Sequence, residues 1–335
     1  MTFVARAACA LGWLWLAGCV ASGPRRDPLD EAHPVRVELE ATPFFPQSDY
    51  QCGPAALATV LAAEAVDVTP EELVPEVYLP ARRGSLQVEL IAATRARGRL
   101  PYLLAPQDDA LFDELAAGRP VLVLQKLGAG PWPGWHYAVL VGYDRDRGSV
   151  LLRSGRTRRL EMSVRRFLLS WERGGRWAML ALTPGALPAG ADMRRYVDAA
   201  AGLEAVGRLD EAARAYRSAS LRWPDAPLPW LGLANVAYAR DDLAKAQSLY
   251  TEALARDPAD VAARNNHAEV LLQLGCRSAA AIEIAVAEER ARGSGLEAAV
   301  TETAGRIAAA MGPDAAGCPT LEQDAGVVEG GARRE

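Results

Sequence analysis

The residue with the clearest chemical potential in this 335-residue chain is Cys52, which lies between Tyr50-Gln51 and Gly53-Pro54. The apolar stretch 55–65 that follows is predicted to be a helix, so the thiol stands at a helix N-terminus. The positive end of the helix dipole favours a thiolate there, and the thiolate is the nucleophilic form. An inert buried cysteine is the alternative, but the polar flanking residues favour a reactive thiol.

The candidate general base follows by elimination among three histidines. His33 lies ahead of the first predicted domain, and His267 occupies a packing position in a helical repeat. His136 begins a predicted strand after the glycine-rich loop 128–134. An imidazole in that position can take the thiol proton and later protonate a leaving amine. The alternative role for His136 is that of a polar residue at the start of an edge strand.

Both residues belong to a predicted α+β domain, residues 37–183, in which helices come first and antiparallel strands follow. The expected helices are 55–65, one from Thr69, 85–98 and 108–117, and the expected strands are 121–124, 137–143, 150–152 and 176–182. The last strand is expected to close the sheet. The arginines from Arg153 to Arg176 are expected to face solvent.

Two segments of this domain resemble a known enzyme family. Residues 44–57, around Cys52, and 134–144, around His136, resemble the nucleophile and histidine segments of bacteriocin-processing, double-glycine leader peptidases. The similarity covers roughly residues 40–182 and implies a papain-like fold with a Cys–His pair. It also implies an oxyanion-stabilising glutamine ahead of the cysteine, a role for which Gln47 is the candidate. The family usually places this glutamine one residue further from the cysteine, and the alternative is a solvated loop residue.

The resemblance further implies an Asp or Asn after the histidine. Asp144 lies eight residues beyond His136, which is about 26 Å along one strand and too far to orient the ring. The turn near 146–148 folds the next strand back, so residues near 154–157 are expected to lie opposite His136. Among the residues there, Ser154 stands about where the family carries its Asp or Asn. Serine can accept a hydrogen bond but carries no charge to stabilise imidazolium. Either catalysis is weakened, or another group such as a backbone carbonyl fills the role.

Residues 1–19 are predicted to be a lipoprotein signal peptide. The apolar run 7–17 is too short to span a bilayer, and it ends in Leu16-Ala17-Gly18-Cys19, which resembles a bacterial lipobox. Cys19 would then carry the lipid, and residues 20–36 would form a tether. Val20 in place of aspartate favours the periplasmic face of a Gram-negative outer membrane. The alternative is a plain secretory signal with an incidental cysteine.

The remaining cysteines suggest one disulfide. Cys9 leaves with the signal peptide, so an exported chain retains Cys52, Cys276 and Cys318 in addition to the lipidated residue. In an oxidising compartment Cys276 and Cys318 are a candidate pair, which would tie the C-terminal tail to the last helices. Such a pair leaves Cys52 as a free thiol.

The C-terminal half, residues 192–312, is predicted to be an all-α solenoid. Corresponding positions recur at a shift of 34 residues, and this pattern resembles tetratricopeptide repeats. The aligned sets are Tyr196, Trp230 and Arg264; Ala212, Ala246 and Ala280; Tyr216, Tyr250 and Ile284; Ala219, Ala253 and Ala287; and Pro224 with Pro258. The third repeat is degenerate, and a capping helix near 296–311 is expected to cover it. Residues 185–190 are read as a linker and 313–335 as a flexible tail.

Net charge and motif content indicate which classes of partner are not expected for this chain. The net charge of −5 and a pI near 5.5 give no reason to expect a nucleic-acid partner, and no motif implies a metal or cofactor. The favoured reading is an envelope-anchored cysteine peptidase or related acyl-transfer enzyme. Its repeats would bind a peptide or protein partner. The alternative is a catalytically inactive peptidase-like lipoprotein that binds or scaffolds.

Overall fold

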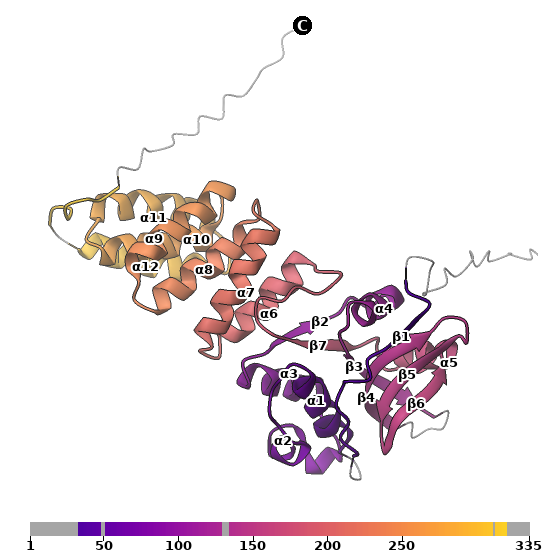
Figure 1. Cartoon of the computed structure of the whole chain (residues 1–335). Coiled ribbons are helices and arrows are strands. Elements are labelled where there is room, and N and C mark those ends of the chain that lie inside the picture. Colours follow the sequence, from indigo (N-terminus) through magenta and orange to yellow (C-terminus); the bar gives the residue numbers. More distant parts are fainter. Residues whose placement is uncertain (1–32, 48–50, 129–133, 311, 320–335) are drawn as a thin grey trace, which may run out of the picture.

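The computed structural model describes residues 33–47, 51–128, 134–310 and 312–319, and it comprises an α+β part followed by a helical part (Figure 1). The predicted fold class is confirmed. The elements of the α+β part are β1 (Arg36–Glu38), α1 (Cys52–Ala63), α2 (Pro70–Val77), η1 (Pro80–Arg82), α3 (Gln87–Ala96), β2 (Leu100–Leu103), α4 (Asp108–Ala116), β3 (Val121–Leu127), β4 (Gly134–Asp144), β5 (Ser149–Ser154), β6 (Thr157–Ser163), α5 (Val164–Arg173) and β7 (Ala178–Leu182).

One antiparallel sheet organises this part, with strand order β2-β7-β3-β4-β5-β6 and with β1 paired to β4. Helix α1 packs on one face and forms a hydrophobic cluster with α2, α3 and the sheet. Helices α4 and α5 pack with a second cluster. The expectation that 176–182 closes the sheet is wrong, because β7 lies inside it, between β2 and β3. Strands β1, β2 and β6 and helix α5 were not predicted, since they are short or polar.

Helix α1 is buried on nearly every side. All residues from Gly53 to Leu61 are buried, because the helix lies between the sheet and α2 and α3. A run of small and apolar residues without charges can be buried in this way, since no polar side chain has to reach water. The consequence is a rigid helix whose first residue, Cys52, is held at the edge of the core.

The helical part repeats with the predicted spacing. Helices α6, α8 and α10 begin at Met193, Pro227 and Val261, and each start is 34 residues after the last. Small residues allow the paired helices to approach, as at Gly232, where a Cβ atom would lie 2.4 Å from the ring of Tyr216. The helices are α6 (Met193–Glu204), α7 (Leu209–Arg222), α8 (Pro227–Ala239), α9 (Leu243–Arg256), α10 (Val261–Gln273), α11 (Arg277–Ala291) and α12 (Glu297–Ala309).

The two parts share a hydrophobic core. Helix α6 packs against β2, and Tyr196 lies with its ring centroid 6.4 Å from Tyr102 and 6.2 Å from Trp223. The linker is fixed as well: the amide of Ala189 donates to Glu114 at 2.7 Å, and that of Asp192 donates to the Tyr102 hydroxyl at 3.1 Å. The repeats are therefore held in one orientation relative to the sheet.

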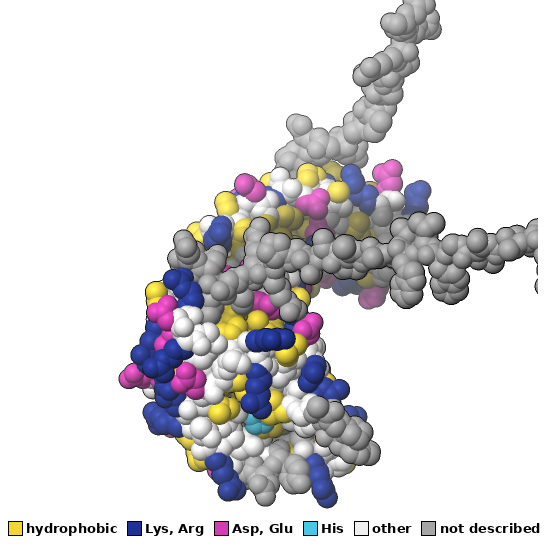
Figure 2. Space-filling view, turned by 90° about the vertical axis from the view of Figure 1, so that its right-hand side faces the viewer, with side chains coloured by type: hydrophobic (Ala, Val, Ile, Leu, Met, Phe, Trp, Pro, Cys, Tyr) yellow, Lys and Arg dark blue, Asp and Glu magenta, His cyan; other side chains and the backbone are white. Residues whose placement is uncertain are grey.

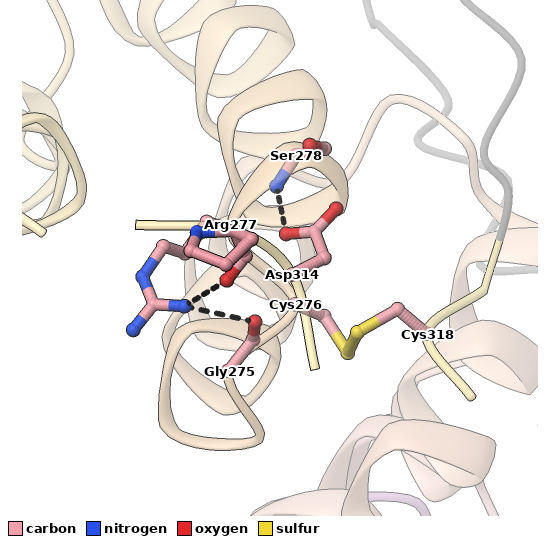
Figure 3. The surroundings of a disulfide bond; sticks show 7 residues. Gly275, Cys276, Arg277, Ser278, Asp314 and Cys318 are labelled. Atoms are coloured by element: carbon pink, nitrogen blue, oxygen red, sulfur yellow. Dashed lines mark hydrogen bonds between the residues drawn. A yellow bond between two sulfur atoms is a disulfide. The ribbon is translucent and has the colours of Figure 1, made fainter. Parts of the chain in front are cut away.

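The described part of the tail is also held in place. Cys276 and Cys318 form a disulfide with an S–S distance of 2.11 Å (Figure 3). Beside it the amide of Ser278 donates to Asp314 at 2.9 Å, and this hydrogen bond lowers the pKa of the Asp314 carboxyl. Arg277 donates to the carbonyl of Pro313 at 2.5 Å. The flexible tail expected from residue 313 is thus wrong for residues 313–319, because the disulfide and these contacts dock them on α11.

Two kinds of feature are absent from the described ranges. No helix among these residues is long and apolar enough to cross a bilayer. Within the same ranges no group of three or more His, Cys, Asp and Glu side chains is placed to hold a metal ion.

Candidate active site

Cys52 is the first residue of α1 and packs against β4. The backbone amides of Tyr137, Gly53 and Cys52 itself stabilise its thiolate, but burial has the larger effect and raises the pKa of the thiol above its ordinary value. The sequence-based expectation of a dipole-stabilised thiolate is therefore wrong for this conformation. Desolvation penalises the charged form more than the helix terminus and the amide donors favour it. Cys52 is the free cysteine of the described residues.

A segment that sequence analysis did not single out packs directly against Gly53, the residue after the cysteine. A Cβ atom at Gly53 would lie 2.3 Å from the Oγ and 2.6 Å from the Cβ of Ser85. The hydroxyl of Tyr137 donates to the carbonyl of Ser85 at 3.4 Å. Gly53 therefore allows the segment after η1 to close on the N-terminus of α1. No sequence signal identified Ser85, because its position depends on Gly53, which lies 32 residues earlier and has no side chain to block the approach.

His136 lies near the start of β4, and its Nε2 is 2.8 Å from the Oγ of Ser154 at the end of β5. The strand register explains this contact, because Val139 pairs with Arg153 on the neighbouring strand. Asp144 pairs with Ser149 at the opposite end of the ladder. His136 and Ser154 are therefore adjacent, as expected for this hairpin, and Asp144 is distant from both.

Burial lowers the pKa of His136, so its imidazole is neutral at pH 7. When Nε2 carries the proton and donates to Ser154, Nδ1 has a free lone pair and can accept a proton from a thiol. No hydrogen bond links Cys52 to His136 in the part of the chain that the structure describes. The site is thus a neutral thiol and a neutral imidazole rather than a preformed ion pair.

Gln47 and Ser154 line one small cavity with Cys52, with a volume of about 10 Å³. The backbone amide of Gln47 donates to the carbonyl of Gly155 at 3.1 Å, which fastens the glutamine beside the end of β5. Of the four predicted site residues, three border this cavity and the fourth, His136, is joined to it through Ser154. The other lining residues are Phe44, Phe45, Ala55, Ala56, Thr59, Tyr137, Arg153 and Gly155.

Arg153 corrects one sequence-based expectation. It was expected to face solvent with the other arginines of this region, but it is 5% exposed. Strand β5 is paired on both sides, with β4 and β6, so its residues are inside the sheet. Burial lowers the pKa of the Arg153 guanidinium.

Replacing Ser154 by aspartate is expected to make Cys52 more reactive at neutral pH. A carboxylate beside Nε2 favours imidazolium and raises the pKa of His136; the imidazolium in turn favours the thiolate. Each unit of pKa shift in the thiol changes the thiolate fraction about tenfold. The pH dependence of alkylation by iodoacetamide would therefore move to lower pH in Ser154→Asp. Ser154→Ala is the control, and identical profiles for the two variants would contradict the assignment.

Comparisons with known proteins agree with the sequence resemblance. Residues 39–178 match the sequence model of the Peptidase_C39 like family. No curated protein matches the chain.

Two solved peptidase structures resemble the α+β part. The peptidase domain of Streptococcus ComA is 22% identical, covering 42% of this chain and 98% of that one, with a TM-score of 0.35. A C39-like peptidase from Bacillus anthracis is 19% identical, covering 43% of this chain and 96% of that one, with a TM-score of 0.36.

A solved structure also resembles the helical part. The Yersinia enterocolitica chaperone SycD, solved with a peptide of the translocator YopD, is 18% identical. It covers 35% of this chain and 92% of that one, with a TM-score of 0.33. Residues 39–178 of this chain thus match the sequence model of the Peptidase_C39 like family, and the helices that follow them repeat at a spacing of 34 residues.

Proposed function

We propose that this chain is a cysteine peptidase, or a related acyl-transfer enzyme, that acts through Cys52 and His136. The observation that carries the proposal is the convergence of Gln47, Cys52 and the His136–Ser154 pair around one cavity. Cys52 Sγ attacks a peptide carbonyl, and a Sγ–C bond forms. Nδ1 of His136 takes the thiol proton and delivers it to the leaving amine nitrogen. The Gln47 amide donates to the oxyanion, and the acyl group then passes to water or to an amine.

The neutral state of the pair determines how the proton moves. Burial disfavours both charged forms, so the thiol keeps its proton and the imidazole stays unprotonated at pH 7. Deprotonation of Cys52 is then coupled to its attack on the carbonyl, with His136 as general base. The buried site favours this sequence, because a separated thiolate and imidazolium would each have to be desolvated.

A second candidate function is peptide binding without turnover. The specific observations that favour it are the uncharged Ser154 beside the imidazole and the raised pKa of the Cys52 thiol. In this reading the domain holds a polypeptide at the cavity and the repeats assemble a complex around it. The retained pair and Gln47 favour the peptidase over this alternative.

The decisive experiment compares the wild type with Cys52→Ala. Each purified protein is incubated with periplasmic extract, and newly formed N-termini are identified by mass spectrometry. The proposal expects termini that appear with the wild type and are absent with Cys52→Ala, because the substitution removes the nucleophile and leaves the helix intact. If both proteins give the same termini while both retain extract proteins on a column, the binding function replaces the peptidase.

We further propose that Cys19 anchors the chain by lipid at the periplasmic face of an outer membrane. Residues 1–32 lie outside the described part, so this proposal rests on the lipobox-like run ending at Cys19. Cys19→Ser is expected to move the protein from the detergent phase to the aqueous phase in a Triton X-114 partition. Cys9→Ser is the matched control, and a wild-type protein in the aqueous phase would contradict the anchor.

The repeats are proposed to bind a peptide or protein partner. Stacked helix pairs form extended concave surfaces suited to a polypeptide. The shared core around Tyr196 fixes α6 against β2, so a partner on the repeats is held at a constant distance from the candidate active site. This arrangement suits the delivery of an extended substrate.

A further inference from the structure

The segment that carries Gln47 is held by one buried side chain. After β1, residues 39–47 leave the sheet, and the amide of Leu39 is the last to join β4, donating to Val141 at 2.8 Å. Beyond that point the carbonyls of the segment have no strand partner. The carbonyl of Leu39 accepts from the amide of Thr42 at 3.0 Å, whereas no backbone amide of the described residues donates to the carbonyl of Glu40 or Thr42. A carbonyl that is shielded from water and has no donor is costly, so a donor has to come from a side chain.

Arg153 supplies these donors. Its Nη2 donates to the carbonyl of Leu39 at 3.5 Å, to that of Glu40 at 3.4 Å and to that of Thr42 at 3.4 Å. Its Nε also donates to Thr42 at 3.4 Å, and its Nη1 donates to the carbonyl of Arg158 at 2.6 Å. The planar guanidinium is suited to this task, because its five N–H groups diverge in a fixed fork.

The end of β5 and the residue after it hold both ends of the segment 39–47. Arg153 fastens the start of the segment, and the carbonyl of Gly155 accepts from the amide of Gln47 at 3.1 Å. Ser154 lies between them and contacts His136 at 2.8 Å. Three consecutive residues thus connect the candidate oxyanion donor to the partner of the candidate base.

The burial of Arg153 indicates that this arrangement is specific. Arg153 is only 5% exposed, and a guanidinium is costly to bury. Its five hydrogen bonds to Leu39, Glu40, Thr42 and Arg158 all end on carbonyls rather than on carboxylates. Arg159 on the neighbouring strand β6 shows the ordinary alternative: it is exposed and donates to the carboxylate of Glu38 at 2.6 Å.

We infer that Arg153 is a positioning residue for the proposed reaction: its guanidinium holds residues 39–47 so that the Gln47 amide reaches the oxyanion formed at Cys52. The inference rests on the proposed function for its chemical consequence. Its structural basis is the set of carbonyl contacts, and this basis can be measured separately. A small displacement of a group that stabilises a transition state is costly, since about 1 Å can reduce a rate on the order of 10²-fold.

The chemical test uses N-acetylglycinal as a probe. Addition of the Cys52 thiol to its aldehyde forms a Sγ–C bond, and the carbonyl oxygen receives the thiol proton, so no group leaves. The resulting oxygen occupies the oxyanion position, whereas alkylation by iodoacetamide forms no oxyanion. Arg153→Lys keeps the charge and loses the fork. It is expected to weaken aldehyde binding about 10- to 100-fold and to change the iodoacetamide rate less than about twofold.

A double-mutant cycle with Gln47→Ala identifies the route of the effect. If Arg153 acts through Gln47, the double variant binds the aldehyde no more weakly than Gln47→Ala alone. Arg159→Lys is the matched control and is expected to bind as the wild type does. Additive losses in the cycle, or an equal loss in the iodoacetamide rate, would overturn the inference.

Hydrogen exchange tests the structural basis without relying on catalysis. Peptides that cover residues 39–47 are expected to exchange faster in Arg153→Lys than in the wild type or in Arg159→Lys, while α1 stays protected. Unchanged exchange of this segment overturns the inference even if the enzyme is active. A wild type that binds no aldehyde, with exchange accelerated in the variant, instead overturns the proposed function and the oxyanion role.

Discussion

His136→Ala is expected to slow the acylation of Cys52 at pH 7 by about 10²- to 10⁴-fold, the usual range for loss of a general base. The imidazole is neutral because burial lowers its pKa, and it is therefore available to take the proton from a thiol whose own pKa is raised. The measurement is the burst of p-nitrophenolate released from p-nitrophenyl acetate, which reports formation of the acyl-enzyme.

The pH dependence gives this prediction its sign. In the wild type the rate of Cys52 acylation is expected to rise as the pH increases through the lowered pKa of His136, because the imidazole is then in its base form. In the variant the rate follows the thiolate and rises with pH toward the raised pKa of Cys52. The two rates differ most near neutrality and converge in alkali. His33→Gln is the control, and parallel profiles for wild type and His136→Ala would remove His136 from the mechanism.

Tyr196→Ala is expected to lower the free energy of unfolding by about 3–5 kcal/mol, the range for deleting a large buried aromatic side chain. Tyr196 is 0% exposed and packs between Tyr102 of the sheet and Trp223 of the repeats. Because one core serves both parts, the wild type is expected to unfold in a single transition in urea. Tryptophan fluorescence and circular dichroism would then give the same midpoint.

Urea unfolding of Tyr196→Ala distinguishes one core shared by the two parts from two independent cores. Tyr238→Ala is the control, because Tyr238 is partly buried on α8 and its contact to Gln273 lies within the repeats. It is expected to cost about 1–3 kcal/mol, because the substitution removes one hydrogen bond and a partly buried ring. A loss in Tyr196→Ala confined to the helical transition, with the sheet unfolding unchanged, would show that the contact does not couple the two parts.

Local pattern in the sequence was sufficient for much of this architecture. The 34-residue spacing predicts the helix pairs, since a repeated pattern of small and aromatic residues selects the same packing each time. The polar setting of Cys52 and the position of His136 mark a candidate pair. Counting across the hairpin predicts residues near 154–157 opposite His136, and Ser154 of this group lies 2.8 Å from the imidazole. The count succeeds only approximately, because a register shift between Leu140 and Gly142 alters the pairing that the turn sets.

Long-range packing decided the rest. The position of β7 between β2 and β3 depends on which strands meet, which no local pattern specifies. Arg153 is an ordinary polar residue in sequence, and it is buried because carbonyls more than 110 positions earlier need its donors. The helix terminus at Cys52 predicts a thiolate, but the surrounding core raises the pKa instead. Desolvation depends on all the atoms that exclude water from a group, so it is determined only when the tertiary structure has formed.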